Sequence, residues 1–209
     1  MKKIILIACA LIATYSVNAQ SDDSRDNLQM GVKAGLNYSN VYDTQGDQFK
    51  ADGRFGLALG GFLSIPIGRF LGIQPEILFS QKGFQGTGNV LGSPYSFNRT
   101  TNYIDIPILL QLKASEQFTL LVGPQYSFLI KQSDVFSTNV LTTQQEQEFS
   151  NDNIRKNTLC FLGGLDVNID RLVIGGRVGW DFMNNNGDGT STTPRYKNVW
   201  SQLTLGYKF

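Results

Sequence analysis

The chain has 209 residues, of which 41% are apolar, and its 18 Lys and Arg residues almost balance its 17 Asp and Glu residues. This balance excludes a basic nucleic-acid-binding protein, and the apolar fraction excludes a highly charged disordered chain. The sequence contains no histidine, which excludes Ser-His and Cys-His catalysis and every His-ligated metal site.

The first predicted element is a cleaved secretory signal peptide over residues 1–19. It begins with a basic pair, continues through an apolar run and ends in Val17-Asn18-Ala19, which suits a signal peptidase. Cleavage removes two lysines and changes the formal net charge from +1 to −1. Residues 20–27 are expected to form a short N-terminal lead. Cys160 is the only cysteine after the signal, so the mature chain has no partner for an intramolecular disulfide.

From residue 28 onward, apolar and polar residues alternate with the period of half-buried β-strands. Eight consecutive segments share this pattern, and each carries one apolar face. They cover residues 28–38, 55–67, 71–79, 104–112, 118–130, 159–169, 172–182 and 199–209. Strands of roughly 11–14 residues are expected. Since about 9–11 tilted residues cross a bilayer, such strands are long enough to span a membrane.

The connections between these segments alternate in length. Residues 68–70, 114–117 and 170–171 form tight turns, whereas residues 40–53, 85–100, 132–156 and 184–197 form long polar loops. Short turns at one end and long loops at the other are typical of outer-membrane barrels, with the turns in the periplasm. The sequence therefore predicts an all-β fold, an eight-stranded antiparallel up-and-down transmembrane β-barrel over residues 28–209.

Alternation alone does not say which face lies inside, because a secreted lipocalin-like calyx alternates in the same way with its apolar face inward. Three features favour a membrane barrel with the polar face inward. First, the polar face carries most of the glycines and charges, which suits a narrow lumen. We predict that the charges pair with one another in the lumen. The candidates are Lys33, Arg54, Glu76, Lys82, Asp105, Asp166, Arg177 and Asp181.

The second feature is the position of the aromatic residues, which lie near the strand ends on the apolar face, as in interfacial girdles. They are Tyr38, Phe55, Phe128, Trp180 and Phe182 at one rim, and Phe118, Tyr207 and Phe209 at the other. The third feature is the last strand, whose apolar face resembles the terminal signal that the barrel-assembly machinery recognises. The predicted barrel-assembly signal comprises Leu203, Leu205, Tyr207 and Phe209. The alternative is an ordinary amphipathic strand.

Several segments carry motifs that occur together in one family. Residues 74–83 (QPEILFSQKG) follow a P-E-aliphatic-x-aromatic-S-x-K-G pattern, and residues 103–108 (YIDIPI) follow a second pattern with a proline after alternating aliphatic and acidic residues. Residues 123–126 (GPQY) and 31–37 (GVKAGLN) add two more. In these motifs and their order the chain resembles the PorT-like outer-membrane β-barrel proteins. The resemblance implies an OmpA-like barrel without the OmpA periplasmic domain. It does not imply an activity, although the founding member assists a secretion system.

The predicted function is that of a non-enzymatic integral outer-membrane protein, a structural or loop-displaying scaffold. Its lumen is expected to be polar and plugged, because inward apolar side chains fill the little space that eight strands enclose. These side chains are Phe62, Leu78, Leu109, Leu121, Leu129 and Leu162. The alternatives are an accessory component of an envelope secretion or assembly system, as the resemblance suggests, and a small diffusion pore.

The expected location is the outer membrane of a bacterial cell. The expected partners are outer-membrane lipid, the barrel-assembly machinery during biogenesis and an envelope protein bound through the external loops, and nucleic acid is not among them. An enzyme is not expected, because small-barrel hydrolases generally use histidine, although a Ser-Lys dyad stays formally open. The sequence predicts no cofactor and no metal ion.

Overall fold

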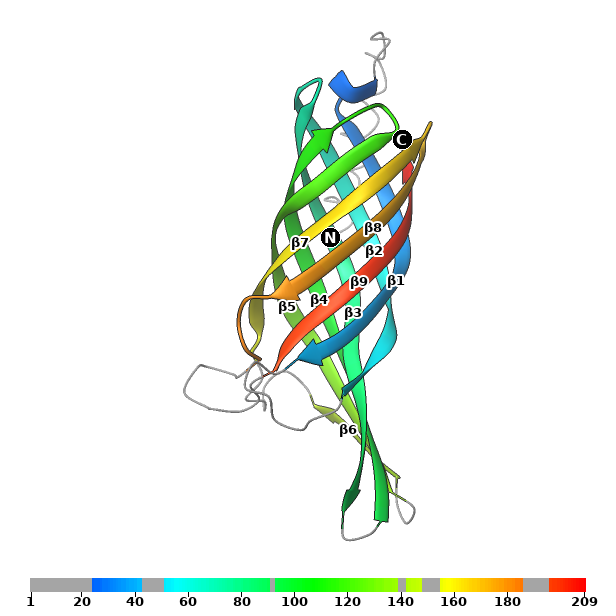
Figure 1. Cartoon of the computed structure of the whole chain (residues 1–209), viewed down its shortest axis with the longest axis vertical. Coiled ribbons are helices and arrows are strands. Elements are labelled where there is room, and N and C mark those ends of the chain that lie inside the picture. Colours follow the sequence, from blue (N-terminus) through cyan, green and yellow to red (C-terminus); the bar gives the residue numbers. More distant parts are fainter. Residues whose placement is uncertain (1–23, 43–50, 91–92, 139–141, 148–154, 186–195) are drawn as a thin grey trace, which may run out of the picture.

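The structure of the protein is a computed structural model that describes residues 24–42, 51–90, 93–138, 142–147, 155–185 and 196–209. The predicted signal peptide, residues 1–19, and the first residues of the predicted lead lie outside these ranges. The described residues form one antiparallel sheet that closes into a tall, narrow barrel (Figure 1). No helix in these ranges is long and apolar enough to cross a membrane.

Eight strands make up the barrel wall. They are β1 (Gln29–Tyr42), β2 (Ala51–Gly68), β3 (Leu71–Val90), β4 (Ser93–Lys113), β5 (Phe118–Thr138), β7 (Asn157–Ile169), β8 (Leu172–Asp181) and β9 (Lys197–Lys208). Each strand pairs with the next one along the wall, and β5 pairs directly with β7. Pairing of β1 with β9, from Gly31 opposite Lys208 to Tyr42 opposite Lys197, closes the sheet. The predicted eight-stranded antiparallel barrel is confirmed.

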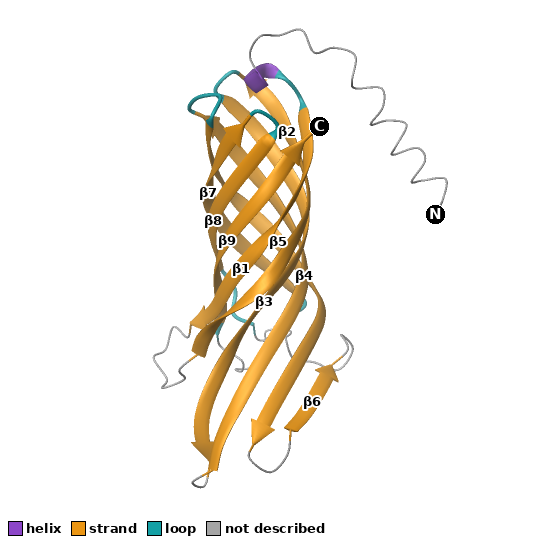
Figure 2. Ribbon diagram, turned by 90° about the vertical axis from the view of Figure 1, so that its right-hand side faces the viewer, coloured by secondary structure: helices purple, strands orange, loops and turns teal. Residues whose placement is uncertain are grey.

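Two of the predicted long loops are wrong, because strands continue through them. β3 extends to Val90, β4 begins at Ser93, and β5 extends to Thr138. A short additional strand, β6 (Thr142–Gln147), then pairs with the end of β5. The four strands form a sheet that projects beyond the barrel wall (Figures 1 and 2). In sequence, residues 85–100 and 132–147 lack the regular apolar alternation that marks a membrane strand.

The polar faces of the strands point into the lumen and the apolar faces point outward. Leu57, Ile77 and Leu203 on the outer surface are 58%, 63% and 64% exposed, whereas Lys33 and Glu76 are only 5% and 2% exposed. A continuous band of exposed apolar side chains is the surface that a barrel presents to lipid. This distribution is the reverse of a soluble calyx, whose apolar face would be the buried one.

Aromatic side chains border this apolar band at both ends. Near the long connections, the rings of Tyr38 and Phe55 lie 5.0 Å apart. Near the tight turns, the rings of Tyr207 and Phe209 lie 6.0 Å apart. Aromatic side chains favour the boundary between hydrocarbon and water, so the two groups mark the height of the membrane-facing wall.

The two ends of the barrel differ in structure, and we call them the turn end and the loop end. The turn end carries the tight connections between β2 and β3, β4 and β5, and β7 and β8. A single 3-10 turn (Ser24–Asp26) also lies there, where Lys113 Nζ donates a hydrogen bond to the carbonyl oxygen of Arg25 at 2.6 Å. The loop end carries the projecting sheet and the long connections.

The lumen is so narrow that many inward positions accept only glycine. A Cβ atom added to Gly60 would lie 2.0 Å from the carbonyl oxygen of Ile77 in the neighbouring strand. The next residue, Gly61, faces outward, and a Cβ atom there would meet nothing closer than 3.4 Å. Glycine at position 60 therefore lets the two strands approach closely. At another inward position, Gly164, a Cβ atom would lie 2.7 Å from Arg177 Cγ, so glycine there leaves room for a charged side chain.

Candidate functional site

Seven charged side chains and one thiol form two clusters at different heights in the lumen. The inner cluster, nearer the turn end, comprises Lys33, Glu76, Asp166 and Arg177. The outer cluster, nearer the loop end, comprises Lys82, Asp105, Cys160 and Asp181. Each set comes from four different strands, because the alternation puts one inward position on every strand at each height. All eight side chains are buried.

Glu76 is the centre of the inner cluster. Its Oε1 atom accepts hydrogen bonds from Lys33 Nζ at 2.7 Å and from Gln74 Nε2 at 2.6 Å, and its Oε2 atom accepts one from Arg177 Nη1 at 2.7 Å. Arg177 Nη2 also lies 3.5 Å from Asp166 Oδ2. Since β3 and β8 lie on opposite sides of the barrel, the Glu76–Arg177 ion pair joins opposite walls. Two positive and two negative charges thus offset one another away from water.

Lys82 occupies the corresponding place in the outer cluster. Its Nζ atom lies 3.0 Å from Asp105 Oδ2 on the next strand. The same ammonium group lies 3.8 Å from the ring centroid of Trp200 and 5.0 Å from that of Tyr103, which adds cation–π attraction. The cation is therefore held by one carboxylate and two aromatic faces.

Asp181 accepts the other hydrogen bonds of the outer cluster. The Cys160 thiol donates to Asp181 Oδ1 at 2.9 Å, and Asn198 Nδ2 donates to Asp181 Oδ2 at 2.6 Å. Ser127 Oγ lies 3.4 Å from Cys160 Sγ. These contacts hold Cys160 in the lumen with no exposed surface.

The structure brings seven of the eight predicted ion-pair candidates into these clusters and leaves Arg54 apart. Arg54 is half-buried near the loop end and donates hydrogen bonds to Asn98 and Thr100. Trp200 and Tyr103, whose rings contact the Lys82 ammonium group, were not among the predicted lumenal residues. Both occupy inward positions in the alternation of their strands, and that pattern was the signal that could have identified them.

A mouth cluster of Phe84, Arg99, Asp134 and Tyr196 lies across the loop end, beyond the aromatic girdle. Arg99 donates to both carboxylate oxygens of Asp134 at 2.8 and 2.6 Å, and to the Tyr196 hydroxyl at 2.7 Å. The rings of Phe84 and Tyr196 lie 5.2 Å apart. Burial lowers the pKa of Arg99, but the hydrogen bonds and charges of Asp134 and Tyr196 outweigh it and raise the pKa above its ordinary value.

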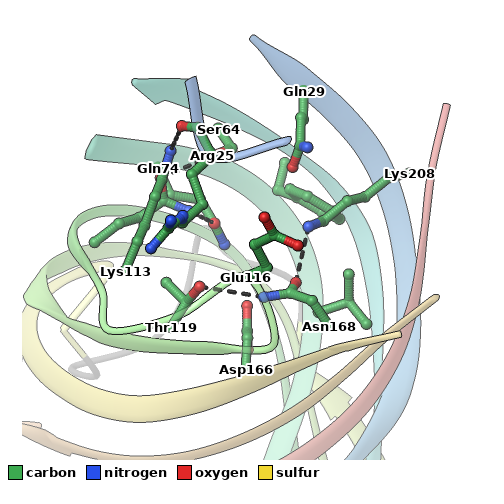
Figure 3. A pocket seen from close by; sticks show the side chains of 13 residues that line it. Arg25, Gln29, Ser64, Gln74, Lys113, Glu116, Thr119, Asp166, Asn168 and Lys208 are labelled. Atoms are coloured by element: carbon green, nitrogen blue, oxygen red, sulfur yellow. Dashed lines mark hydrogen bonds between the residues drawn. The ribbon is translucent and has the colours of Figure 1, made fainter. Parts of the chain in front are cut away.

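The turn end of the lumen opens into a shallow polar recess (Figure 3). On one side, Ser64 Oγ donates to Gln111 Oε1 at 2.8 Å, and Gln111 Nε2 donates to Gln74 Oε1 at 2.5 Å. On the other side, Lys208 Nζ donates to Asn168 Oδ1 at 2.8 Å. The recess ends at the inner cluster, because Gln74 donates onward to Glu76 and Asp166 lines the recess.

The side chains of the predicted assembly signal lie on the outer surface of the barrel. Leu203, Leu205, Tyr207 and Phe209 are all exposed and face the same way along β9 and the residue after it. Within the described ranges, no group of three or more metal-ligating side chains converges. The polar groups of the two lumenal clusters hydrogen-bond mainly to one another.

Comparison with protein families gives one match, a model described as an outer membrane protein beta-barrel domain, over residues 18–187. The chain is also similar to solved structures. Ail, the attachment invasion locus protein of Yersinia pestis, is 16% identical, with 87% of this chain and 98% of that chain covered at a TM-score of 0.49.

Two other solved structures are more distant. The outer membrane protein OprG from Pseudomonas aeruginosa is 11% identical, with 90% of this chain and 98% of that chain covered at a TM-score of 0.40. The outer membrane protease OmpT from Escherichia coli is 10% identical, with 91% of this chain and 99% of that chain covered at a TM-score of 0.36. No curated protein matches this chain in sequence.

Proposed function

The chain belongs to the outer membrane protein beta-barrel domain family and lies in the bacterial outer membrane, and from this premise we propose that it acts as a non-enzymatic scaffold with a plugged polar lumen. The scaffold anchors the projecting sheet in the membrane and presents it outside the cell. The lumen serves stability rather than transport. The tight turns face the periplasm in this arrangement, as in other outer-membrane barrels.

The observation that carries this proposal is the cross-linked interior of the barrel. Glu76 holds side chains from two other strands, and the Glu76–Arg177 ion pair crosses the lumen from wall to wall. Buried apolar side chains fill the cross-sections beside the charges, among them the mutually packed Leu109, Leu121 and Leu162. An ion that crossed the lumen would have to break these contacts, at a cost that an open pore does not impose.

A non-enzymatic role is supported by the way the reactive groups are engaged. Lys82 is held by Asp105 and by the aromatic faces of Trp200 and Tyr103. The Cys160 thiol donates to Asp181 and is fully buried. A nucleophile needs access to substrate as well as a neighbouring base, and the burial of Lys82 and Cys160 opposes that access.

The purified barrel is expected to be electrically silent in planar lipid bilayers, because the lumen is closed by ion pairs and packed side chains. The measurement is single-channel current over a range of voltages. A shift in gel mobility between boiled and unboiled samples is the control for a folded barrel. Reproducible current steps from folded protein would overturn the plugged lumen and favour the diffusion pore.

A second candidate function is that of an accessory in an envelope secretion or assembly system. It is favoured by the projecting sheet of β3, β4, β5 and β6, which extends well beyond the barrel wall (Figure 2). We propose two partners for the protein. One is the barrel-assembly machinery, which would recognise the outward side chains of Leu203, Leu205, Tyr207 and Phe209. The other is an envelope protein bound at the projecting sheet.

Shortening the projecting hairpin is expected to abolish binding of such a partner while leaving the barrel intact. Gly86 and Phe97 are cross-strand partners, so residues 87–96 can be replaced by a two-residue Asn-Gly turn. The measurement is crosslinking in whole cells, with Arg69→Ala at the turn end as the matched control. Unchanged crosslinked products in the shortened variant, or normal secretion in a deletion strain, would remove the support for this candidate.

A further inference from the structure

The mouth cluster ties the base of the projecting sheet to the opposite side of the barrel. Arg99 on β4 and Asp134 on β5 belong to strands that continue into the sheet, whereas Tyr196 directly precedes β9. In the closed ring, β4 and β9 are four steps apart in either direction. The hydrogen bond of 2.7 Å from Arg99 Nη1 to the Tyr196 hydroxyl therefore crosses the mouth of the lumen.

Further contacts hold both ends of this bond. Asp134 accepts two hydrogen bonds from Arg99, at 2.8 and 2.6 Å, and so fixes the plane of the guanidinium. The ring centroid of Phe84 on β3 lies 5.2 Å from that of Tyr196 and 6.0 Å from Arg99 Cζ. The carbonyl oxygen of Tyr196 accepts a hydrogen bond from the backbone amide of Asn185 at 3.0 Å. Oriented polar and aromatic contacts therefore attach the sheet to the far wall.

The strand pairing is interrupted at one height, where the barrel wall becomes the projecting sheet. Between β2 and β3, residues 54–57 and 81–83 lie within a register shift. Between β4 and β5, the register shifts again between Asn102 and Tyr103. Residues 81–83 pair with residues 100–102 of β4, so the two interruptions lie side by side. Irregularities of this kind bend strands and disrupt the ladder of hydrogen bonds, so the wall bends most easily along this line.

Gly83 lies on this line in a conformation that suits only glycine. Its φ is 153°, and a Cβ atom there would clash with the carbonyl oxygen of Arg99. Ser39 Oγ on β1 accepts a hydrogen bond from the Gly83 amide at 2.8 Å and donates one to the Gly83 carbonyl oxygen at 2.9 Å. These two bonds hold β3 to the wall at the point where its regular pairing with β2 is interrupted.

We propose that the projecting sheet is hinged at this line, with Gly83 as its pivot, and that the Arg99–Tyr196 hydrogen bond braces it across the mouth of the lumen. With the brace intact, the sheet has one orientation relative to the barrel. Without the brace, the sheet swings about the pivot while the barrel wall keeps its shape. The inference rests on the proposed scaffold, because it concerns how that scaffold orients the surface that it displays.

The test is the distance between two nitroxide labels, measured by pulsed electron paramagnetic resonance in lipid vesicles. One label is attached at Ser96→Cys in the projecting part of β4 and the other at Ser201→Cys on β9, both at exposed positions. Cys160→Ser removes the native thiol from every sample. The protein with an intact mouth cluster is expected to give a single narrow distance peak, because the sheet has one orientation.

Two substitutions remove the brace. Tyr196→Phe removes only the hydroxyl that accepts from Arg99, and Arg99→Gln removes the guanidinium that also binds Asp134. In Tyr196→Phe the fraction of molecules outside the main peak is expected to rise about tenfold, the factor by which a lost hydrogen bond to a charged group shifts an equilibrium. A larger rise is expected in Arg99→Gln. If Arg99→Gln fails the gel-mobility test for folding, Tyr196→Phe carries the comparison alone.

Tyr207→Phe is the matched control, because the Tyr207 hydroxyl accepts a hydrogen bond from Arg171 at the opposite end of the barrel. This variant is expected to keep the narrow peak. A second pair of labels, at Ile108→Cys in the wall part of β4 and at Ser201→Cys, reports on the barrel alone. Its distance is expected to be the same in every variant. Broadening of this second pair in the mouth variants would overturn the hinge, because the wall itself would have loosened.

The brace itself is overturned by equal distance distributions with and without it, or by a broad distribution in the protein with an intact mouth cluster. Bilayer recordings keep this outcome distinct from the proposed function. Current through the unaltered protein would overturn the plugged scaffold, whatever the label distances are. Equal label distances in a silent barrel would overturn the brace and leave the scaffold standing.

Discussion

The Glu76→Gln variant is expected to unfold with a free energy about 3–5 kcal/mol lower than that of the unaltered barrel. The substitution keeps the shape of the side chain and removes its charge. Lys33 and Arg177, both buried, then face only the single carboxylate of Asp166. Uncompensated positive charge in the lumen is costly, because the surrounding wall and lipid solvate it poorly. The measurement is reversible urea unfolding in lipid vesicles, followed by gel mobility.

Two further variants test the origin of this loss. Glu116→Gln removes an exposed carboxylate at the turn end and is expected to change stability by less than about 0.5 kcal/mol. The double variant Lys33→Met with Glu76→Gln removes one charge of each sign and is expected to recover part of the loss, as coupled sites do. A loss in Glu76→Gln no larger than that in Glu116→Gln would contradict the role of the inner cluster.

Leu203→Arg is expected to destabilise the barrel by about 2–4 kcal/mol, because it places a charge on the lipid face near the centre of the bilayer. Leu203 lies midway on β9 between Tyr207, at one aromatic border, and Val199, which pairs with Trp180 near the other. Its side chain is 64% exposed, and its cross-strand partners on β1 and β8 are Leu36 and Gly176, which carry no charge. The measurement is again reversible urea unfolding in lipid vesicles, followed by gel mobility.

The depth dependence provides the control for this prediction. Leu28 is exposed just before β1, at the turn end of the apolar band. Leu28→Arg is therefore expected to lower the free energy of unfolding by only about 0–1 kcal/mol. The long arginine side chain can reach water from there. Equal losses at the two positions would mean that the exposed apolar band does not lie across the hydrocarbon core.

The alternation of the sequence was enough to predict the strands of the barrel and the face that each side chain occupies. A membrane strand has water or polar side chains on one side and lipid on the other, so its residues must alternate. This is why Lys33, Glu76 and Arg177 could be placed in the lumen without a structure. It is also why Leu203 and Tyr207 could be placed on the outer surface.

Alternation says nothing about depth, and depth decides which charges meet. Glu76 contacts Lys33 and Arg177, and Asp105 contacts Lys82, because the tilt of the strands sets the height of each residue. The same reasoning placed Arg54 with the ion pairs, although its height brings it to Asn98 and Thr100 instead. The register between distant strands has no local signal in the sequence.

The projecting sheet was missed for a different reason. Residues 85–100 and 132–156 were interpreted as loops because they are long and mostly polar. A strand that leaves the membrane meets water on both faces, so composition no longer distinguishes it from a loop. The mouth cluster depends on this same region, since Arg99 and Asp134 face each other as cross-strand partners in β4 and β5.

The seam between β1 and β9 constrains when the protein can enter the membrane. Gly31 lies opposite Lys208, so one edge of β1 pairs with β9, the strand of the barrel farthest from it in the sequence. While β9 is absent, that edge has unpaired amide and carbonyl groups, which the hydrocarbon core does not tolerate and which invite aggregation. Closure of the seam must therefore accompany insertion of the barrel. Contacts of such high sequence separation also make closure a slow step.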